Sequence, residues 1–198
     1  MTQLSELPLS RQDIRQTIRQ RRRALMPSQQ IEFGQHAATR MLAYPPVVMA
    51  HTVAAFLSFD GELDTQPLIE QLWRAGKRVY LPVLHPFSPG NLLFLHYHPQ
   101  SELVLNRLKI QEPRLDVRDV LPLSELDVLI TPLVAFDEYG QRLGMGGGFY
   151  DRTLQNWQQH GLTPVGYAHD CQRVEKLPVE EWDIPLPAVV TPSKVWEW

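Results

Sequence analysis

Residues 140–154, with the sequence GQRLGMGGGFYDRTL, combine glycine, arginine, aromatic and acidic side chains in a pattern suited to a phosphorylated ligand. The glycine cluster at 144–148 permits backbone conformations in which N–H groups approach a ligand closely. An apolar run of strand length, 128–136, precedes it, and apolar residues at helical spacing follow it. A helix that begins here would offer unpaired N–H donors and the positive end of its dipole to a polyphosphate. The alternative is a flexible connector or a hairpin turn.

This stretch differs from the common nucleotide-binding motifs. It lacks the Gly-Lys-Ser/Thr of a Walker A loop, and Phe149 occupies the third glycine position of the dinucleotide fingerprint. Asp151 would lie in the first turn of the helix, where a carboxylate can hold a magnesium ion against a phosphate. The residues therefore predict a phosphate site of another type.

A strongly basic helix is expected near the N-terminus, with Ser10 as N-cap, Asp13 at the third position and an end at about Leu25. Its apolar stripe is Ile14, Ile18 and Leu25. The arginines of this helix are Arg11, Arg15, Arg19, Arg21, Arg22 and Arg23. A solvated basic face and a phosphate-binding face are both compatible with that pattern.

A β-α-β unit is predicted over residues 52–83. It comprises a strand in 52–59, a helix bearing Leu68, Ile69, Leu72 and Trp73 with Gly76 as its cap, and a strand over 78–83. Such units have parallel strands, and ligands bind beyond the carboxyl ends of those strands. Glu62 follows the first strand and is expected there, whereas Asp64 is expected to cap the helix.

The remaining elements complete an α/β pattern. A second helix from Ser28 is expected to end before Pro45 and to turn Ile31, Ala38, Met41 and Leu42 inward. Further strands are expected at 92–97, antiparallel, at 163–168 and, as the last strand, at 188–191. Residues 84–126 are otherwise read mostly as loop. One α/β domain, 1–198, is predicted, with a mainly parallel sheet, helices on both faces, and N-terminal helices (about 10–43) packed on a core of about 50–195.

Composition narrows the class of protein. The formal net charge is −3, which favours neither a nucleic-acid partner nor a membrane surface. No apolar run is long enough for a membrane span, and the single cysteine, Cys171, suits a reducing compartment. A soluble, cytoplasmic protein is expected. Cys171 near His169 could form a nucleophile and base, although an inert thiol is the simpler interpretation. His96 and His98 likewise suggest a metal site or, more simply, surface histidines.

A resemblance to a known family makes these expectations specific. RLGMGGGFYD at 142–151, preceded by PLVAFD at 132–137, closely resembles the signature of 5-formyltetrahydrofolate cyclo-ligases, also called methenyltetrahydrofolate synthetases. The resemblance extends from the basic N-terminal helix to Asp183. It implies a three-layer α/β/α Rossmann-like fold. It also implies an enzyme that converts 5-formyltetrahydrofolate to 5,10-methenyltetrahydrofolate with ATP and Mg²⁺, releasing ADP and phosphate. A monomer is expected.

The resemblance also assigns residues. For ATP it implies Arg11, Gln12, Asp13, Ile14 and Arg15 with Arg142, Leu143, Gly144, Met145, Gly146, Gly147, Gly148, Phe149 and Tyr150. For the folate it implies Leu57, Glu62, Met145, Gly147 and Phe149, and for the metal Asp151 and Asp183. The catalytic groups would be Arg142, Arg15 and Asp151, which neutralise charge during phosphoryl transfer.

Three positions depart from the family pattern. Arg11 replaces the usual lysine, Gly147 stands where some members have lysine, and Phe149 replaces tyrosine. Gln172 matches a recurrent glutamine, and 110–113 resembles a short family stretch without assigned chemistry. The rival function is a non-catalytic sensor that binds a phosphorylated metabolite at the glycine loop, with neither magnesium nor a second pocket.

Overall fold

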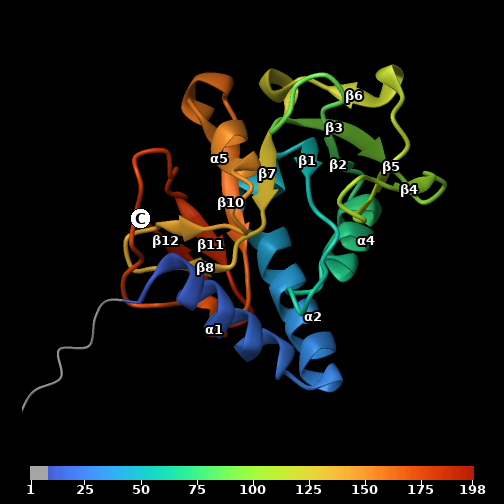
Figure 1. Ribbon diagram of the computed structural model, residues 1–198. Helices are drawn as coiled ribbons and strands as arrows, with labels where there is room; N and C mark the ends of the chain where they lie inside the picture. Colours follow the sequence, from blue (N-terminus) through green and yellow to red (C-terminus); the bar gives the residue numbers. More distant parts are fainter. Residues whose placement is uncertain (1–8) are drawn as a thin grey trace, which may run out of the picture.

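An eight-stranded sheet forms the centre of the computed structural model, which describes residues 9–198 (Figure 1). In sheet order its strands are β12 (Val195–Glu197), β11 (Ala188–Val190), β10 (Thr163–Tyr167), β7 (Val128–Thr131), β1 (Thr52–Ala54), β2 (Arg78–Leu84), β3 (Leu92–Tyr97) and β6 (Val120–Leu121). The strands from β11 to β2 are parallel, whereas β12, β3 and β6 pair antiparallel at the edges. The predicted α/β class with a mainly parallel sheet is confirmed.

Two short hairpins and several helices surround this sheet. The hairpins pair β4 (Leu103–Leu105) with β5 (Gln111–Pro113) and β8 (Ala135–Phe136) with β9 (Arg142–Leu143). The α-helices are α1 (Arg11–Arg23), α2 (Pro27–Ala43), α3 (Pro45–Met49), α4 (Gln66–Arg74) and α5 (Phe149–Leu154). Short 3₁₀ turns are η1 (Val117–Asp119), η2 (Leu123–Glu125), η3 (Trp157–His160) and η4 (Asp170–Gln172). No helix within residues 9–198 has both the length and the apolar composition needed to cross a membrane.

Alternating residues of the central strands build a core on each face of the sheet. One core combines strand residues with α2 and α4 and includes Val53, Val79, Val128, Met41 and Leu72. The opposite core combines the alternate strand residues with α5 and includes Ala54, Tyr80, Leu129, Val189 and Leu154. The parallel strands are covered on both faces, which explains why their sequences are apolar runs.

Helix α1 packs apart from these two cores. Its apolar residues Ile14 and Ile18 are buried with Ala135 and Leu143 of the β8–β9 hairpin, beside which the helix runs (Figure 1). Ser10 caps it in a reciprocal capping box with Asp13, as predicted, although the helix ends at Arg23 instead of about Leu25. This packing places the basic helix next to the strand that leads into the glycine loop.

Several predicted boundaries were wrong for identifiable reasons. The apolar run 52–59 is a strand only to Ala54, and the run 128–136 is divided between β7 and β8 at Pro132, which has no N–H to donate. Chain reversal at 191–194 adds β12, so 188–190 is not the last strand. Ile31, predicted to face inward, is exposed on α2, and a further helix, α3, begins at Pro45.

Candidate active site

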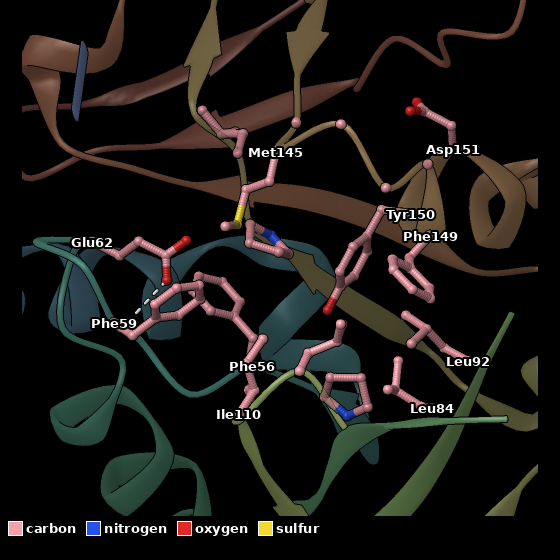
Figure 2. A pocket seen from close by; sticks show the side chains of 18 of the residues that line it. Phe56, Phe59, Glu62, Leu84, Leu92, Ile110, Met145, Phe149, Tyr150 and Asp151 are labelled. Carbon is pink, nitrogen blue, oxygen red and sulfur yellow. Dashed lines mark hydrogen bonds between the residues drawn. The ribbon is translucent and has the colours of Figure 1, made fainter. Parts of the chain in front are cut away.

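A cavity of about 480 Å³ opens at the carboxyl ends of the parallel strands β1, β2 and β7. One wall comes from the chain after β1, with Phe56, Leu57, Phe59 and Glu62. The opposite wall is the glycine loop and the start of α5, as Figure 2 shows for Met145, Phe149, Tyr150 and Asp151. The position agrees with the general rule for ligands in open α/β sheets.

The glycine loop connects β9 to α5 and uses glycine where the backbone requires it. Gly146 has φ 109° and Gly148 has φ 70°, conformations that side chains with a Cβ rarely adopt. Gly148 is the N-cap of α5. Because α5 contains only 6 residues, its dipole is short, and the nearby arginines are the stronger positive charges.

Two arginines hold this loop from either side. Arg15 of α1 donates from Nε to the carbonyl oxygen of Gly144 at 2.8 Å, and its pKa is lowered by burial and by the positive charges of Arg11 and Arg19. Arg142 of β9 is 4% exposed and donates to Asp151 Oδ1 at 2.9 Å and to Pro132 O at 3.2 Å. Both guanidinium groups border the cavity, so a phosphate bound to the loop would meet two cations.

The two candidate metal ligands are both paired with arginine. Asp151 pairs with Arg142, and its Oδ1 also accepts from the backbone N–H of Ile184 at 3.2 Å. Arg11 donates from Nη2 to Asp183 Oδ1 at 3.1 Å and from Nη1 to Asp183 Oδ2. These hydrogen bonds raise the pKa of Arg11. Within residues 9–198, no three His, Cys, Asp or Glu side chains gather as a metal-binding cluster. The contact to Ile184 nevertheless brings the segment that contains Asp183 against Asp151.

Glu62 is a nearly buried carboxyl on the apolar side of the cavity. It is 8% exposed, and its Oε2 accepts from the backbone N–H of Phe59 at 3.1 Å, the dashed line in Figure 2. Burial, opposed by the Phe59 hydrogen bond and by Arg22, raises its pKa to about 7. An acidic side chain in such surroundings gains much from a ligand that donates hydrogen bonds to it.

Tyr150 faces the same space from α5. Figure 2 shows its ring projecting into the cavity beside Phe149, and its hydroxyl has no hydrogen-bond partner within residues 9–198. Burial raises its pKa above the ordinary tyrosine value, so the phenol stays neutral and remains a donor. An unpaired buried hydroxyl costs free energy unless a ligand accepts from it.

The region that the sequence left unread supplies a third wall. The β4–β5 hairpin brings Asn106, Leu108 and Ile110 to the cavity. Glu112 fixes the hairpin, because its Oε2 accepts from the backbone N–H of Leu84 at 3.0 Å and from Asn106 Nδ2 at 3.0 Å. The only signal in the sequence was the unassigned family stretch at 110–113.

Most of the predicted site residues meet at the cavity, and some do not. Those that border it are Arg11, Arg15, Leu57, Glu62, Arg142, Gly144, Met145, Gly146, Gly147, Gly148, Phe149, Tyr150 and Asp151. Ile14 and Leu143 are instead buried in the core beneath α1, and Gln12 and Asp13 are exposed on the helix. Asp183 lies behind Arg11 and does not border the cavity.

Two other side chains that the sequence singled out, Gln172 and His169, are buried away from the cavity. Gln172 is buried and donates from Nε2 to the carbonyl oxygens of Leu133 and Val134. His169 packs edge-on against Phe33, and burial lowers its pKa to about 4. It is therefore neutral at physiological pH.

Comparisons with known proteins agree with this geometry. The model of the 5-formyltetrahydrofolate cyclo-ligase family matches residues 9–192. A 5-formyltetrahydrofolate cyclo-ligase of Escherichia coli strain K12 is 89% identical over 181 residues, 91% of this chain and 100% of the relative. A protein of the same name from Haemophilus influenzae is 53% identical over 176 residues, 89% of this chain and 94% of the relative.

A solved structure supports the same relationship. The NMR structure of Aquifex aeolicus 5,10-methenyltetrahydrofolate synthetase superposes with a TM-score of 0.81 at 26% identity. The match covers 96% of this chain and 93% of that one. The glycine loop, the arginines around it and the family match over nearly the whole length lead to one conclusion: the chain belongs to the 5-formyltetrahydrofolate cyclo-ligase family.

Proposed function

We propose that this chain closes 5-formyltetrahydrofolate to 5,10-methenyltetrahydrofolate while ATP becomes ADP and phosphate, and that both substrates occupy the cavity described above. Family membership supports the reaction. The observation that supports the assignment of the site is that Glu62 and the two cations Arg15 and Arg142 border one cavity from different walls. A sensor for a single phosphorylated metabolite would not need the acidic, apolar half.

ATP is assigned to the side of the glycine loop. Arg142 and Arg15 would neutralise the phosphate oxygens, and the loop N–H groups would donate to them. Arg142 is paired with Asp151, so a phosphate would compete with that carboxylate for the guanidinium. Arg11 is similarly held by Asp183, which supports an indirect role for Asp183 in orienting this arginine.

The folate is assigned to the apolar side. Pteridine N–H groups are donors, and the carboxylate of Glu62 accepts two of them once it is ionised. Leu57, Phe59 and the ring of Phe149 supply apolar contact for the pterin ring. The formyl group would then lie between the Glu62 wall and the glycine loop.

The chemistry requires activation of an amide. The formyl oxygen attacks the γ-phosphorus and ADP leaves, which converts the formyl oxygen into a phosphate leaving group. N10 of the same folate then attacks the activated carbon, the C–O bond breaks to release phosphate, and the N10 proton passes to water. No protein nucleophile is needed. Proximity of N10 and charge neutralisation by the arginines lower the barriers.

The carboxylates of Asp151 and Asp183 are suitable magnesium ligands once their ion pairs with Arg142 and Arg11 rearrange. Oδ2 of Asp151 accepts no hydrogen bond from residues 9–198, so one hard oxygen donor remains available beside the phosphate side. A bound Mg²⁺ would reduce the negative charge of the phosphate oxygens. We assign Asp151 as its protein ligand, with Asp183 as the second candidate behind Arg11.

The test uses labelled substrate. 5-Formyltetrahydrofolate carrying ¹⁸O in the formyl group should give ¹⁸O-labelled phosphate, together with methenyltetrahydrofolate absorbance that requires both ATP and magnesium. Unlabelled phosphate would exclude phosphorylation of the formyl oxygen. Absence of methenyltetrahydrofolate would refute the assigned reaction itself.

We further propose that the protein works in the cytoplasm as a monomer without nucleic-acid or membrane partners. The single cysteine and the near-neutral charge of the sequence support this. Light scattering over a range of protein concentrations would reveal any association.

A further inference from the structure

Three arginines at the end of α1 converge on one aspartate outside the cavity. Arg22 is 0% exposed and donates from Nε to the Asp60 carbonyl oxygen at 2.8 Å and from Nη2 to Asp60 Oδ2 at 3.2 Å. Arg23 contacts Oδ1, and Nε of Arg19 lies 3.7 Å from Oδ2. Three of the six arginines of α1 are therefore paired with Asp60 and not directed at the cavity, and Arg22 alone among the three is fully buried.

Asp60 is the corner of a tight turn whose two ends form part of the cavity. The N–H of Glu62 donates to the Phe59 carbonyl oxygen at 3.0 Å, and the central residues Asp60 and Gly61 have φ 55° and 75°. Positive φ at both central positions is the geometry that Asp-Gly favours. Phe59 and Glu62 both border the cavity, so the placement of this turn sets the placement of the Glu62 carboxyl.

The turn is clamped to α1 by backbone as well as by charge. A Cβ on Gly61 would lie 3.2 Å from the carbonyl carbon and oxygen of Arg22 and 3.2 Å from the nitrogen of Arg23. Gln30 Nε2 donates to the carbonyl oxygens of both Arg22 and Gly61, at 3.2 and 3.3 Å. Helix and turn thus contact each other without intervening side chains.

The same helix reaches the phosphate side at its other end. Arg15 lies two turns before Arg22 and donates to the glycine loop, and Arg11 also borders the cavity. One helix therefore connects the loop assigned to ATP with the turn that presents Glu62. Stability alone explains the buried guanidinium poorly, because desolvating an arginine costs about as much as its ion pair returns.

We propose that Asp60 and Arg22 are positioning residues that lock the Phe59–Glu62 turn onto α1 and so set the place of the Glu62 carboxyl relative to Arg15. The proposal rests on the assignment of Glu62 to the folate. It predicts that loosening the clamp misplaces the folate and leaves the ATP contacts intact.

The main test is Asp60→Asn. Asparagine tolerates positive φ and keeps an acceptor for Arg22, so the variant should fold while losing the charge that holds three arginines. We expect the KM for 5-formyltetrahydrofolate to rise by about 10-fold or more, since a misplacement of about 1 Å can cost about 100-fold. The KM for ATP should stay within about twofold. Glu70→Gln, which removes an exposed carboxylate paired with Arg74 on α4, is the matched control and should change neither constant.

A second variant approaches the turn through its backbone. Gly61→Ala keeps every charge but adds a Cβ at φ 75° against the end of α1, and it should produce the same selective loss for folate. If both variants fail to fold, Arg23→Gln removes only the exposed arginine from Asp60 and must give a smaller shift of the same kind. Equal changes in both KM values, or a lower melting temperature with unchanged kinetics, would overturn the proposal.

Glu62→Gln separates this proposal from the function on which it rests. If Glu62→Gln leaves the folate KM unchanged, the assignment of Glu62 is wrong. If it raises that KM and Asp60→Asn does not, only the positioning role fails. When both roles hold, the double variant should be little worse than Glu62→Gln alone, because the turn then has no carboxylate to place.

Discussion

Arg142 and Asp151 form one ion pair at the edge of the cavity, with Nη2 donating to Oδ1 at 2.9 Å. The side chain of Arg142 is 3% exposed and that of Asp151 is 13% exposed, so the pair is shielded from solvent. Changing either residue leaves the other charge without its partner. Experiments on this pair must therefore separate lost chemistry from a lost structural contact.

Arg142 is expected to act through its charge and its fork geometry. Arg142→Ala should lower kcat by about 10- to 1000-fold and raise the ATP requirement, since one preorganised donor is lost. Arg142→Lys should recover only part of the activity, because a point charge cannot contact both Pro132 O and a phosphate. Steady-state kinetics in both substrates provides the measurement. Wild-type ATP dependence in Arg142→Ala would show that the residue does not meet phosphate.

Arg15→Ala is expected to weaken the use of ATP, as Arg142→Ala does, and Arg152 provides a control variant. Arg15→Ala should raise the KM for ATP, since it removes a cation and the hydrogen bond to Gly144. Arg152 also supports the loop, donating to Gly147 O at 2.9 Å, but does not border the cavity. Arg152→Ala should therefore affect ATP much less. Equal effects of the two variants would mean that loop support, and not charge, explains the role of Arg15.

The pH dependence should follow Glu62. With a pKa of about 7, the carboxyl is protonated in acid and cannot accept two pteridine donors, so kcat/KM for the folate should rise with pH through about 7. Glu62→Gln should lose about 2 to 4 kcal/mol of transition-state binding and this pH limb, with little change for ATP. Initial rates from pH 5.5 to about 9 would show it. A limb retained in Glu62→Gln would belong to another group.

The same carboxyl should make folding stability depend on pH. Its pKa rises from 4.5 to about 7 on folding, so the folded state binds the proton more tightly. The stability it contributes is complete below pH 4.5 and is lost as pH rises through 7, by about 3 kcal/mol. The free energy of unfolding of Glu62→Gln, measured with urea, should therefore increase relative to that of the wild type as the pH rises from about 5 to 8. Parallel stability curves would contradict the buried environment of Glu62.

Asp151 is expected to act through the metal. Asp151→Asn keeps an acceptor for Ile184 N–H and should stay folded, with a melting temperature lowered by the loss of the Arg142 ion pair, while requiring more magnesium. Asp183→Asn should show a milder shift, since its carboxylate orients Arg11. Magnesium titrations of initial rates beside thermal melts would separate these cases. Equal loss at every magnesium concentration in Asp151→Asn would indicate a direct role without the metal.

Gly147 and Phe149 should behave as a coupled pair. A Cβ on Gly147 would lie 2.8 Å from Cδ2 and Cε2 of Phe149, so the ring occupies the space a larger residue would take. Gly147→Ala should lower kcat/KM, and Phe149→Leu should relieve part of that loss by about 1 kcal/mol of coupling. Gly146→Ala, strained by φ 109°, is the control that Phe149→Leu should not relieve. If the effects of Gly147→Ala and Phe149→Leu simply add in the double variant, the Phe149 ring moves freely and the two positions are not coupled.

Local sequence was sufficient for the elements whose signals are local. The capping box at Ser10, the helix over Gln66–Arg74 and the parallel β1–β2 pair follow from caps, apolar spacing and connection length. The glycine loop and its following helix were also predictable, because positive φ leaves a residue preference that can be read directly.

The failures came from contacts between distant segments. The run 128–136 breaks at Pro132, and its second half pairs with β9 instead of extending β7. Ile31 is exposed on α2, whose contacts with α4 use other residues. The β4–β5 wall carries few regular apolar signals, and its position is held by Glu112 contacting Leu84, 28 residues away.

The sequence by itself determined the family, the fold class and most of the residues that border the cavity, because motifs and apolar periodicity can be read without coordinates. Only the tertiary structure decided which arginines of α1 face the cavity and which pair with Asp60. Arginines on one helix face looked equivalent, yet Arg15 turns to the glycine loop while Arg22 is buried on Asp60. Burial and ion pairing depend on partners far along the chain, so no local pattern could assign them.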